Sequence, residues 1–358
     1  MDESRIKIIK KKRMKKIYIL FSLAIAIGAF CTSCNDEWTE EQFRQEVSFK
    51  AEPNGNGVKF AYLRYRPDGT VRYELPIILS GSTMNPDTKT VHVTLDPDTL
   101  AVLNNEQYGG RKEIYFQQLD PQYYSFPETV EIPAGECTAV LPIDFTLGGR
   151  EGNNPLDESE KWVLPLTIVD DDSYDYKANP RKHYRKAILR ISPFNDYSGS
   201  YAANRYQIAM EGVSSTFQMD RVRSFVMDDQ TIFIYAGTRD IDYLDRKNYK
   251  VFIKFTDEII DHVFGKKKIE MWSDNTENNK FKVITSNELP VPYYTMTEEF
   301  DVQKPYLKRV YIDIHLAYEF VDYTTLPGSE MKYTVNGSLS MERELNTLIP
   351  DEDQQIQW

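Results

Sequence analysis

The sequence predicts an all-β fold with two domains, an antiparallel β-sandwich followed by a β-barrel or curled antiparallel sheet. Runs of 4–8 residues rich in β-branched and aromatic side chains recur along the chain, and Gly, Pro, Asn or Asp residues separate them. This pattern is typical of short strands joined by turns, and only one segment has helical spacing. Removing an N-terminal leader of 33 residues leaves 325 residues, enough for two domains at about 150 residues each.

A secretory signal peptide is predicted over residues 1–33. Residues 7–16 are strongly basic, and the 14 residues from Ile17 to Phe30 carry no charge. A bilayer-spanning helix needs about 20 apolar residues, whereas a basic start, a short apolar core and a small-residue exit are typical of a cleaved signal. Met14 precedes Lys15-Lys16, as is usual at the start of such a signal, so we expect Met14 to be the true start.

Cys34 is the predicted lipidation site, where an acylated (palmitoyl) cysteine would anchor the mature chain to a membrane. Thr32-Ser33 before it are small enough for a lipoprotein signal peptidase, whereas Cys31 follows the large Phe30. An ordinary secreted protein and a retained membrane anchor are the alternatives. The acidic Asn35-Asp36-Glu37 resembles the export signal that sends Bacteroidota lipoproteins to the outer face of the outer membrane. A position facing the periplasm is the alternative placement.

The mature chain is predicted to be strongly acidic and free of internal disulfides. Residues 1–33 hold 8 of the 43 basic and 2 of the 55 acidic residues, which leaves 35 against 53 and a net charge of −18. Such a surface repels nucleic-acid phosphates, so no nucleic-acid partner is expected. Of the three cysteines, only Cys137 lies in the part expected to fold. A disulfide framework is therefore excluded, and we interpret Cys137 as a strand residue.

The first domain is predicted over residues 47–193, after a polar, lipidated tether at residues 34–46. The turn signal Pro67-Asp68-Gly69 separates two of its strands, because Pro presets φ and Gly supplies a positive φ. Residues 98–105 have an acidic start and helical spacing, so we expect a short helix there. Strands at this spacing favour an antiparallel sandwich. The predicted strands are residues 58–65, 72–79, 90–95, 129–135, 138–145, 161–169 and 185–191.

The second domain is predicted over residues 194–346, beyond a boundary at Pro193–Asp196. Its strands are longer and polar turns separate them, so a meander is the simplest path. An up-and-down barrel or curled sheet would hide the strand edges, and we therefore expect a lipocalin-like domain. Residues 347–358 are polar and acidic, and we expect a loose tail. The predicted strands are residues 205–210, 216–227, 231–236, 249–255, 268–272, 281–284, 293–302, 308–318 and 332–341.

Several short motifs resemble a known family of lipoproteins. Tyr123-Tyr124-Ser125-Phe126-Pro127, followed by Val130-Glu131-Ile132-Pro133-Ala134-Gly135 and a strand, resembles the Ig-like N-terminal domain of two-domain Bacteroidota surface lipoproteins. The genes of these proteins lie in polysaccharide-utilisation loci, beside glycan importers of the starch-utilisation-system type. Pro193-Phe194-Asn195-Asp196-Tyr197-Ser198-Gly199-Ser200-Tyr201 resembles the junction into their second domain. Tyr333-Thr334-Val335-Asn336-Gly337-Ser338-Leu339 resembles the closing strand of that domain.

This resemblance implies an Ig-like β-sandwich, a lipocalin-like second domain and a function at the cell surface. We expect a non-catalytic glycan-binding lipoprotein of the outer membrane, accessory to a polysaccharide uptake complex. Its expected partners are a polysaccharide or oligosaccharide, the outer-membrane importer with its lipoprotein partners, and the lipid bilayer through Cys34. A structural or adhesive surface protein that contacts other proteins is the alternative, and a weak glycoside hydrolase is the third hypothesis.

Aromatic residues in polar surroundings are the candidate glycan-binding residues. Sugar rings stack their apolar C–H faces on flat aromatic side chains, while their hydroxyls pair with Asn, Asp and Arg, and loops often carry such sites. Trp272 ends a strand and precedes a polar run, Tyr293 and Tyr294 follow two prolines, and Tyr243 lies between aspartates. These four residues are the predicted binding residues. The alternative interpretation is that their rings anchor loops to the domain.

No group of residues indicates catalysis, a metal or a cofactor. The four histidines are scattered singly, without the spacing of a helical zinc site. Nucleotide-binding and nucleophile-elbow signatures are absent from the sequence. Asp170-Asp171-Asp172 and Asp175 cluster oxygens that could bind calcium, but we prefer a solvated loop between strands. We therefore expect no enzyme activity, no metal and no cofactor.

Overall fold

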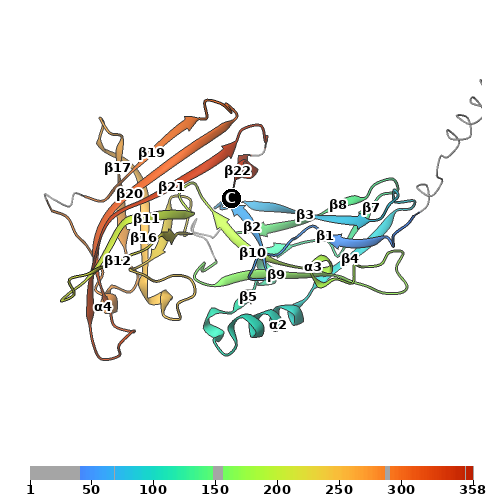
Figure 1. The fold of residues 1–358 in the computed structure, drawn as a ribbon, viewed down its shortest axis with the longest axis horizontal. Helices are drawn as coiled ribbons and strands as arrows, with labels where there is room; N and C mark the ends of the chain where they lie inside the picture. The colour runs from blue at the N-terminus through green and yellow to red at the C-terminus, as the bar shows by residue number, and fades with distance from the viewer. Residues whose placement is uncertain (1–40, 68, 148–155, 287–290, 351, 358) are drawn as a thin grey trace, which may run out of the picture.

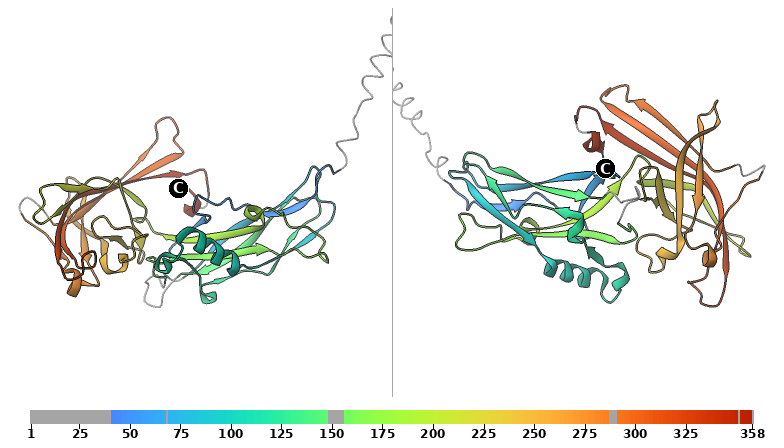
Figure 2. Two further views of the ribbon diagram at one scale, coloured as in Figure 1. Left: turned by 60° about the horizontal axis from the view of Figure 1, so that its bottom comes forward. Right: turned by 180° about the vertical axis from the view of Figure 1, so that it is seen from behind.

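The structure is a computed structural model, which describes residues 41–67, 69–147, 156–286, 291–350 and 352–357. The predicted lipidation site Cys34 and the acidic Asn35-Asp36-Glu37 lie outside these residues. Two domains lie side by side along the long axis of the molecule, with the C-terminus near their junction (Figures 1 and 2). Within the described residues, no helix combines the length and the apolar character needed to cross a membrane.

The first domain is a sandwich of two sheets. Its strands are β1 (Glu46–Phe49), β2 (Lys59–Arg64), β3 (Thr70–Ser80), β4 (Lys89–Leu95), β5 (Phe116–Gln118), β6 (Tyr124–Ser125), β7 (Thr129–Ile132), β8 (Thr138–Thr146), β9 (Lys161–Ile168) and β10 (Lys186–Phe194). One sheet has the order β1-β3-β8-β6, and the other has the order β2-β10-β9-β4-β7, with β5 beside β9. Alternating residues such as Leu75 and Ile77 of β3, and Leu164 and Leu166 of β9, meet in one buried core.

The predicted helix is confirmed and is longer than expected. Helix α2 spans Pro97–Tyr108, and it begins where the Asp96 carboxylate accepts a hydrogen bond from the Thr99 amide at 3.0 Å. Pro97 stands in the first turn, where its missing N–H leaves no hydrogen bond unmade. Gly109 ends the helix with a φ of 57°. The domain also contains the short helices η2 (Lys112–Ile114), η3 (Pro121–Tyr123) and α3 (Lys182–Arg185).

The second domain is one curled sheet, and the predicted all-β class is confirmed. Its strands are β11 (Ser200–Met210), β12 (Thr216–Gln218), β13 (Arg221–Arg223), β14 (Phe225–Val226), β15 (Thr231–Tyr235), β16 (Lys250–Asp261), β17 (Lys266–Trp272), β18 (Lys282–Val283), β19 (Tyr293–Phe300), β20 (Leu307–Asp322), β21 (Met331–Asn346) and β22 (Ile356–Gln357). The order is β12-β11-β21-β20-β19-β17-β16-β15-β14, so consecutive strands form antiparallel neighbours along most of the sheet. The short helices η4 (Arg246–Tyr249), α4 (Thr276–Asn279) and η5 (Glu352–Gln354) complete the domain.

The predicted strand at residues 216–227 is wrong, because this segment forms three short strands. β13 pairs with β11 at one end of the sheet, whereas β14 pairs with β15 at the other end. Between them, the Ser224 amide donates to the Gly199 carbonyl at 2.8 Å, and the Gly199 amide donates to Ser224 Oγ at 2.9 Å. The chain therefore changes partner at Ser224, and this change brings the two ends of the curled sheet together.

A dense hydrogen-bond network holds the junction motif between β10 and β11. Asn195 Oδ1 accepts hydrogen bonds from the Tyr197 amide at 3.0 Å and the Ser198 amide at 2.7 Å. The buried guanidinium of Arg343, on β21, donates to the carbonyls of Asn195 at 3.1 Å, Asp196 at 3.2 Å and Ser198 at 2.5 Å. Such charge-assisted hydrogen bonds are strong when buried. The role of the motif is therefore structural: it fixes the chain where the first domain passes into the second.

The described end of the predicted tether contacts the first domain. The Glu41 carboxylate accepts hydrogen bonds from the Ser82 amide and the Thr83 hydroxyl, both at 2.7 Å. These bonds favour the ionised form, and they hold the pKa of Glu41 well below its usual range. Residues 41–46 are therefore attached to the loop between β3 and β4.

The prediction of a loose C-terminal tail is wrong for residues 352–357, which the structure describes. Strand β22 pairs with β21, and the Ile356 side chain is buried. Asp353 forms ion pairs with Arg64 of β2 and, at 2.7 Å, with Arg66, both in the first domain. Burial and ion pairing offset the entropy lost on ordering, so this segment links the two domains.

Candidate functional site

The domains meet over an aromatic cluster on the second domain. Its members lie on β14, β15 and β16: Phe225, Phe233, Tyr235 and Phe252. These rings lie on the face of the sheet opposite its main core. Beside them, the Val226 amide donates to Glu158 of the first domain at 2.7 Å, and Lys250 pairs with Asp157 at 2.8 Å. The interface is therefore part apolar and part charged, as is common between domains.

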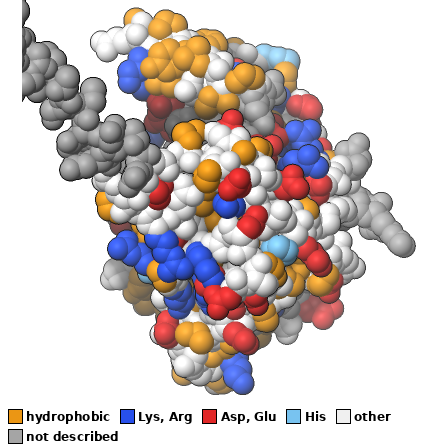
Figure 3. Space-filling model, turned by 90° about the vertical axis from the view of Figure 1, so that its right-hand side faces the viewer, with side chains coloured by type: hydrophobic (Ala, Val, Ile, Leu, Met, Phe, Trp, Pro, Cys, Tyr) orange, Lys and Arg blue, Asp and Glu red, His pale blue; other side chains and the backbone are white. Residues whose placement is uncertain are grey.

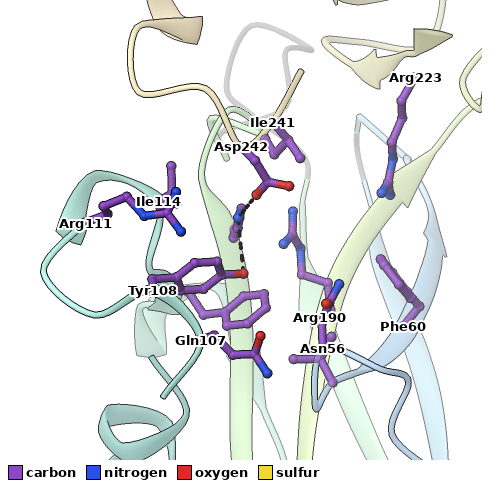
Figure 4. A pocket seen from close by; sticks show the side chains of 13 residues that line it. Asn56, Phe60, Gln107, Tyr108, Arg111, Ile114, Arg190, Arg223, Ile241 and Asp242 are labelled. Atoms are coloured by element: carbon purple, nitrogen blue, oxygen red, sulfur yellow. Dashed lines mark hydrogen bonds and ion pairs between the residues drawn. The ribbon is translucent and has the colours of Figure 1, made fainter. Parts of the chain in front are cut away.

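A cleft of about 280 Å³ opens at this interface, and both domains line it (Figure 4). Lys161 on β9, Arg190 on β10 and Arg111 after α2 come from the first domain, while Arg223 on β13 and Asp242 come from the second. Four basic side chains and one acid thus surround the opening. Ligand sites occur preferentially at domain interfaces, so this cleft is the candidate functional site.

Lys161 connects the two walls of the cleft. Its ammonium forms an ion pair with Asp242 across the interface and donates to the Tyr108 hydroxyl at 3.2 Å (Figure 4). It also lies 4.4 Å from the centroid of the Tyr108 ring and 5.8 Å from that of Phe116. Cation–π attraction and the ion pair together compensate for the burial of this charge.

The guanidinium groups of Arg190 and Arg223 lie over aromatic rings and form no ion pair with a carboxylate among the described residues. The guanidinium of Arg190 lies 5.8 Å from the Phe116 centroid, and Arg223 lies 5.4 Å from the centroids of both Phe60 and Phe225. Burial and the neighbouring charge of Arg223 lower the pKa of Arg190 to about 10. Because that value is still well above neutral pH, the Arg190 guanidinium is charged there.

Glu158 lies beside these arginines, in a small pocket that shares Arg190 and Arg223 with the cleft lining. Burial raises the pKa of Glu158 to about 8, although the Val226 amide and the two arginines favour its ionised form. Near neutral pH this carboxyl is therefore mostly protonated in the folded protein. It does not neutralise the positive charge of the cleft.

The Glu158→Gln variant is expected to lose part of the pH dependence of stability. The unfolded chain releases the proton near pH 4.5 and the folded chain only near pH 8. The contribution of this group to stability is therefore fully present below about pH 4.5 and is lost as pH rises towards 8, at up to about 1 kcal/mol per pH unit. Urea denaturation at pH 6 and pH 9 should show a smaller loss for Glu158→Gln than for the wild type.

The exposed Glu136→Gln variant is the control for this experiment, and it should follow the wild type. Equal pH dependence of Glu158→Gln and the wild type would contradict the raised pKa of Glu158.

Trp272, one of the four predicted binding residues, presents an accessible ring. It is 40% exposed and stacks on Phe252 with centroids 5.4 Å apart and planes at 15°. The polar run after it has a structural role: Asn279 donates to the Asn248 carbonyl at 3.0 Å and to Ser273 Oγ at 2.9 Å. These amides hold the loop and are not directed at a ligand beside the ring.

Tyr293 and Tyr294 point to opposite faces of β19. Tyr294 is 1% exposed and packs edge-on against Phe255 in the main core, so its ring has no face available to a ligand. Tyr293 stacks on His315 at 4.5 Å and lies below Lys266. The register of β17 and β19 puts Tyr293 opposite Lys268, four residues from Trp272, which is roughly 13 Å along the strand.

Tyr243 lies on the loop that also carries Ile241 and Asp242, two residues of the cleft lining. Its side chain is exposed. Of the four predicted residues, it is the one whose loop borders the cleft. The structure does not combine the four into a single platform.

Apart from the loop of Tyr243, the cleft is lined by residues that were not among the predicted binding residues. Arg190 interrupts the apolar run Ala187-Ile188-Leu189-Arg190-Ile191, and a charge inside a buried strand is a signal that could have been used. Arg223 carries no comparable local signal, because it lies on an exposed strand position and its partner Phe60 belongs to the other domain.

The acidic run at residues 170–175 forms a loop in which local groups use the carboxylates. Asp171 accepts a hydrogen bond from the Ser173 amide at 2.9 Å, and Asp172 pairs with Lys177. Within the part of the chain that the structure describes, no three His, Cys, Asp or Glu side chains are placed to hold a metal ion.

Comparisons with known proteins identify relatives over both domains. Residues 38–172 match a family described as a domain of unknown function (DUF4973), and residues 185–340 match one described as "-like, C-terminal". A Bacteroides ovatus protein of unknown function is 40% identical, with a TM-score of 0.74 over 88% of this chain and 100% of that chain. The chain belongs to this family of Bacteroides proteins. No curated protein matches it.

Two further members of the family have solved structures. One is a multidomain protein including DUF1735 from Bacteroides ovatus, 39% identical, with a TM-score of 0.74 over 88% of this chain and 100% of that chain. The other is described as an auxiliary nutrient binding protein from Bacteroides thetaiotaomicron. It is 36% identical, with a TM-score of 0.75 over 85% of this chain and 97% of that chain.

Proposed function

We propose that this chain is a non-catalytic, cell-surface glycan-binding lipoprotein that serves a polysaccharide uptake complex. The observation that carries the proposal is the 36% identity to the auxiliary nutrient binding protein over 97% of that protein's length. A glycan is the nutrient that the predicted location and the exposed aromatic side chains favour. The interdomain cleft is the proposed binding site, and the exposed Trp272 is a second contact for a longer chain.

The cleft and Trp272 offer the two kinds of contact that sugars need. Phe60 and Tyr108, which are half-buried, supply apolar ring surface in the cleft, and charged groups beside them can pair with hydroxyls. The volume of about 280 Å³ is just below the roughly 300–1,000 Å³ typical of small-molecule sites. The cleft therefore suits a small unit of a glycan rather than a long segment.

Isothermal titration of residues 35–358 against a polysaccharide panel tests this function. We expect at least one polysaccharide to bind, and the Trp272→Ala variant to bind it about tenfold more weakly, equivalent to about 1.4 kcal/mol of binding free energy. The control is Phe264→Ala, which removes another exposed aromatic ring at a distant hairpin end. No binding to any member would contradict the proposed function, and unchanged affinity of Trp272→Ala would remove that residue from the site.

The lipid anchor at Cys34 and the exposed location on the outer membrane belong to the same proposal. A lipid tether before the first domain would hold the cleft above the membrane, where it could pass a bound glycan to the importer. Incorporation of labelled palmitate, abolished in Cys34→Ala, tests the anchor. Protease accessibility on intact cells distinguishes the outer face from the periplasmic face.

A second candidate function, contact with other proteins, is favoured by apolar side chains at two hairpin ends. Val263 and Phe264 lie between β16 and β17, and Phe300 and Val302 lie at the end of the β19–β20 hairpin. All four are strongly exposed, and exposed apolar groups often mark interaction surfaces. Crosslinks from these positions to a single protein partner on cells, unaffected by added glycan, would favour this function.

A further inference from the structure

We propose that the interdomain cleft binds the anionic group of an acidic saccharide, either a uronate carboxylate or a sulfate ester. The inference rests on the proposed glycan-binding function and names the class of glycan that the same cleft would take. Three features of the described residues carry it: an unbalanced positive charge, a buried arginine that pairs with no carboxylate, and aromatic surface beside both.

The positive charge of the cleft is not balanced by the protein. Lys161 and Asp242 form an ion pair with each other, so their charges cancel. Arg111, Arg190 and Arg223 form no ion pair with any carboxylate among the described residues. These three unpaired arginines contrast with the net charge of the whole chain, which is −12. They also contrast with the end face of the first domain, where basic and acidic groups lie next to one another (Figure 3).

Arg190 is the strongest indication of an anion site. Its residue surface is 8% exposed, and its guanidinium faces Asp242 and Arg223 across the cleft (Figure 4). Among the described hydrogen bonds, none is donated by this guanidinium to a protein group. A buried charge is costly unless it is paired. A guanidinium presents its donors in a planar fork that matches the two oxygens of a carboxylate or sulfate.

Arg223 and Arg111 extend the site towards solvent. Arg223 is exposed and donates only a long hydrogen bond of 3.4 Å to Ser192 among the described groups, so its other donors can reach a ligand. Glu158, which shares a small neighbouring pocket with Arg190 and Arg223, keeps its proton near neutral pH and leaves the positive charge in place. Charges of one sign in a cleft concentrate ligands of the opposite sign.

The aromatic surface distinguishes a charged sugar from a free inorganic anion. Phe60 is half-buried in the wall beneath Arg223, and the half-buried Tyr108 lies in the opposite wall, where it packs on the buried Phe116. A sugar ring can place an apolar face on such a ring while its acidic group reaches the arginines. The volume of the cleft admits one such unit, so a terminal or single acidic residue of the glycan is the expected contact.

The experiment uses pairs of probes that differ only in charge. Isothermal titration of residues 35–358 compares trigalacturonate with its fully methyl-esterified form, and a sulfated carrageenan tetrasaccharide with its desulfated form. We expect one acidic probe to bind at least about tenfold more tightly than its neutral partner, and Arg223→Gln to lose about tenfold or more of that affinity. Binding of only the carboxylated or only the sulfated probe would support the site and identify the anionic group.

Arg221→Gln is the matched control, because Arg221 is an exposed arginine on the same strand that does not line the cleft. It should bind the acidic probe as the wild type does. Arg111→Gln is a second exposed cleft variant, and it should weaken binding as Arg223→Gln does.

Equal affinity for the acidic and neutral probes, with no effect of Arg223→Gln, would overturn the inference and leave the glycan-binding function in place. No binding of any saccharide, including the polysaccharide panel, would overturn both.

Discussion

Replacing Gly337 with alanine is expected to lower the free energy of unfolding of the second domain by about 4 kcal/mol. Gly337 lies on β21 with a φ of 134°, and a Cβ there would meet the Arg205 carbonyl oxygen of β11 at 1.8 Å. The register of β11 against β21 shifts just before Arg205, where the backbones approach closely. A side chain would therefore force both strands apart. Urea denaturation of the variant and the wild type measures the loss.

The Gly212→Ala variant separates the cost of a positive φ from the cost of the steric clash with the neighbouring strand. Gly212 also has a positive φ, 78°, but no atom outside its own turn lies within 4 Å of the position that a Cβ would take. We expect a smaller loss, about 1 kcal/mol. Similar losses in the two variants would contradict the importance of the close approach at Gly337.

Removing the side chain of Arg246 is expected to uncouple the domains and to cost about 3–5 kcal/mol of stability. Arg246 belongs to the second domain and is 1% exposed. Its guanidinium donates to the carbonyls of Ser159 at 2.8 Å and Glu113 at 3.1 Å in the first domain, and to the Tyr243 carbonyl at 2.9 Å. In Arg246→Ala these buried acceptors lose their partner, and each unmet group costs about 1–3 kcal/mol.

Urea denaturation, followed by tryptophan fluorescence and far-ultraviolet circular dichroism, tests this expectation. The curve of Arg246→Ala should shift to lower urea, and the two signals should separate because the domains no longer unfold together. Lys247→Ala is the control. Its side chain is 49% exposed and pairs with Glu160 across the same interface, so we expect a loss below about 1 kcal/mol. Equal losses for the two variants would contradict the role of Arg246.

The types of the main elements could be predicted because their causes are local. The acidic start and spacing of residues 98–105 correspond to α2, which Asp96 caps and Pro97 begins. The alternating run at residues 72–79 corresponds to β3, whose Leu75 and Ile77 point into the core. In both cases the signal lies within a few residues of the element that it predicts.

The errors occur where a distant segment decides the local structure. The run at residues 216–227 is not one strand, because its partner changes from β11 to β15 at Ser224, which bonds to Gly199. The acidic tail folds back because Asp353 meets Arg64, which is 289 residues away. Neither contact has a signature in the residues next to it.

The predicted binding residues show the same difference between what the local sequence indicates and what distant contacts decide. Trp272 and Tyr294 both stand in polar surroundings in the sequence, yet Trp272 is exposed and Tyr294 is buried. Successive residues of a strand point to opposite faces, so only one of Tyr293 and Tyr294 could face solvent. Which one does so depends on the core that the rest of the sheet forms.

The sequence by itself determined the all-β class, most strand positions and the acidic charge, because these follow from composition and from periodicities set by backbone geometry over a few residues. Only the tertiary structure decided where a site could form. The cleft takes Lys161 and Arg190 from one domain and Arg223 and Asp242 from the other. Its charge depends on which arginines find a carboxylate after folding, and that is a property of long-range contacts.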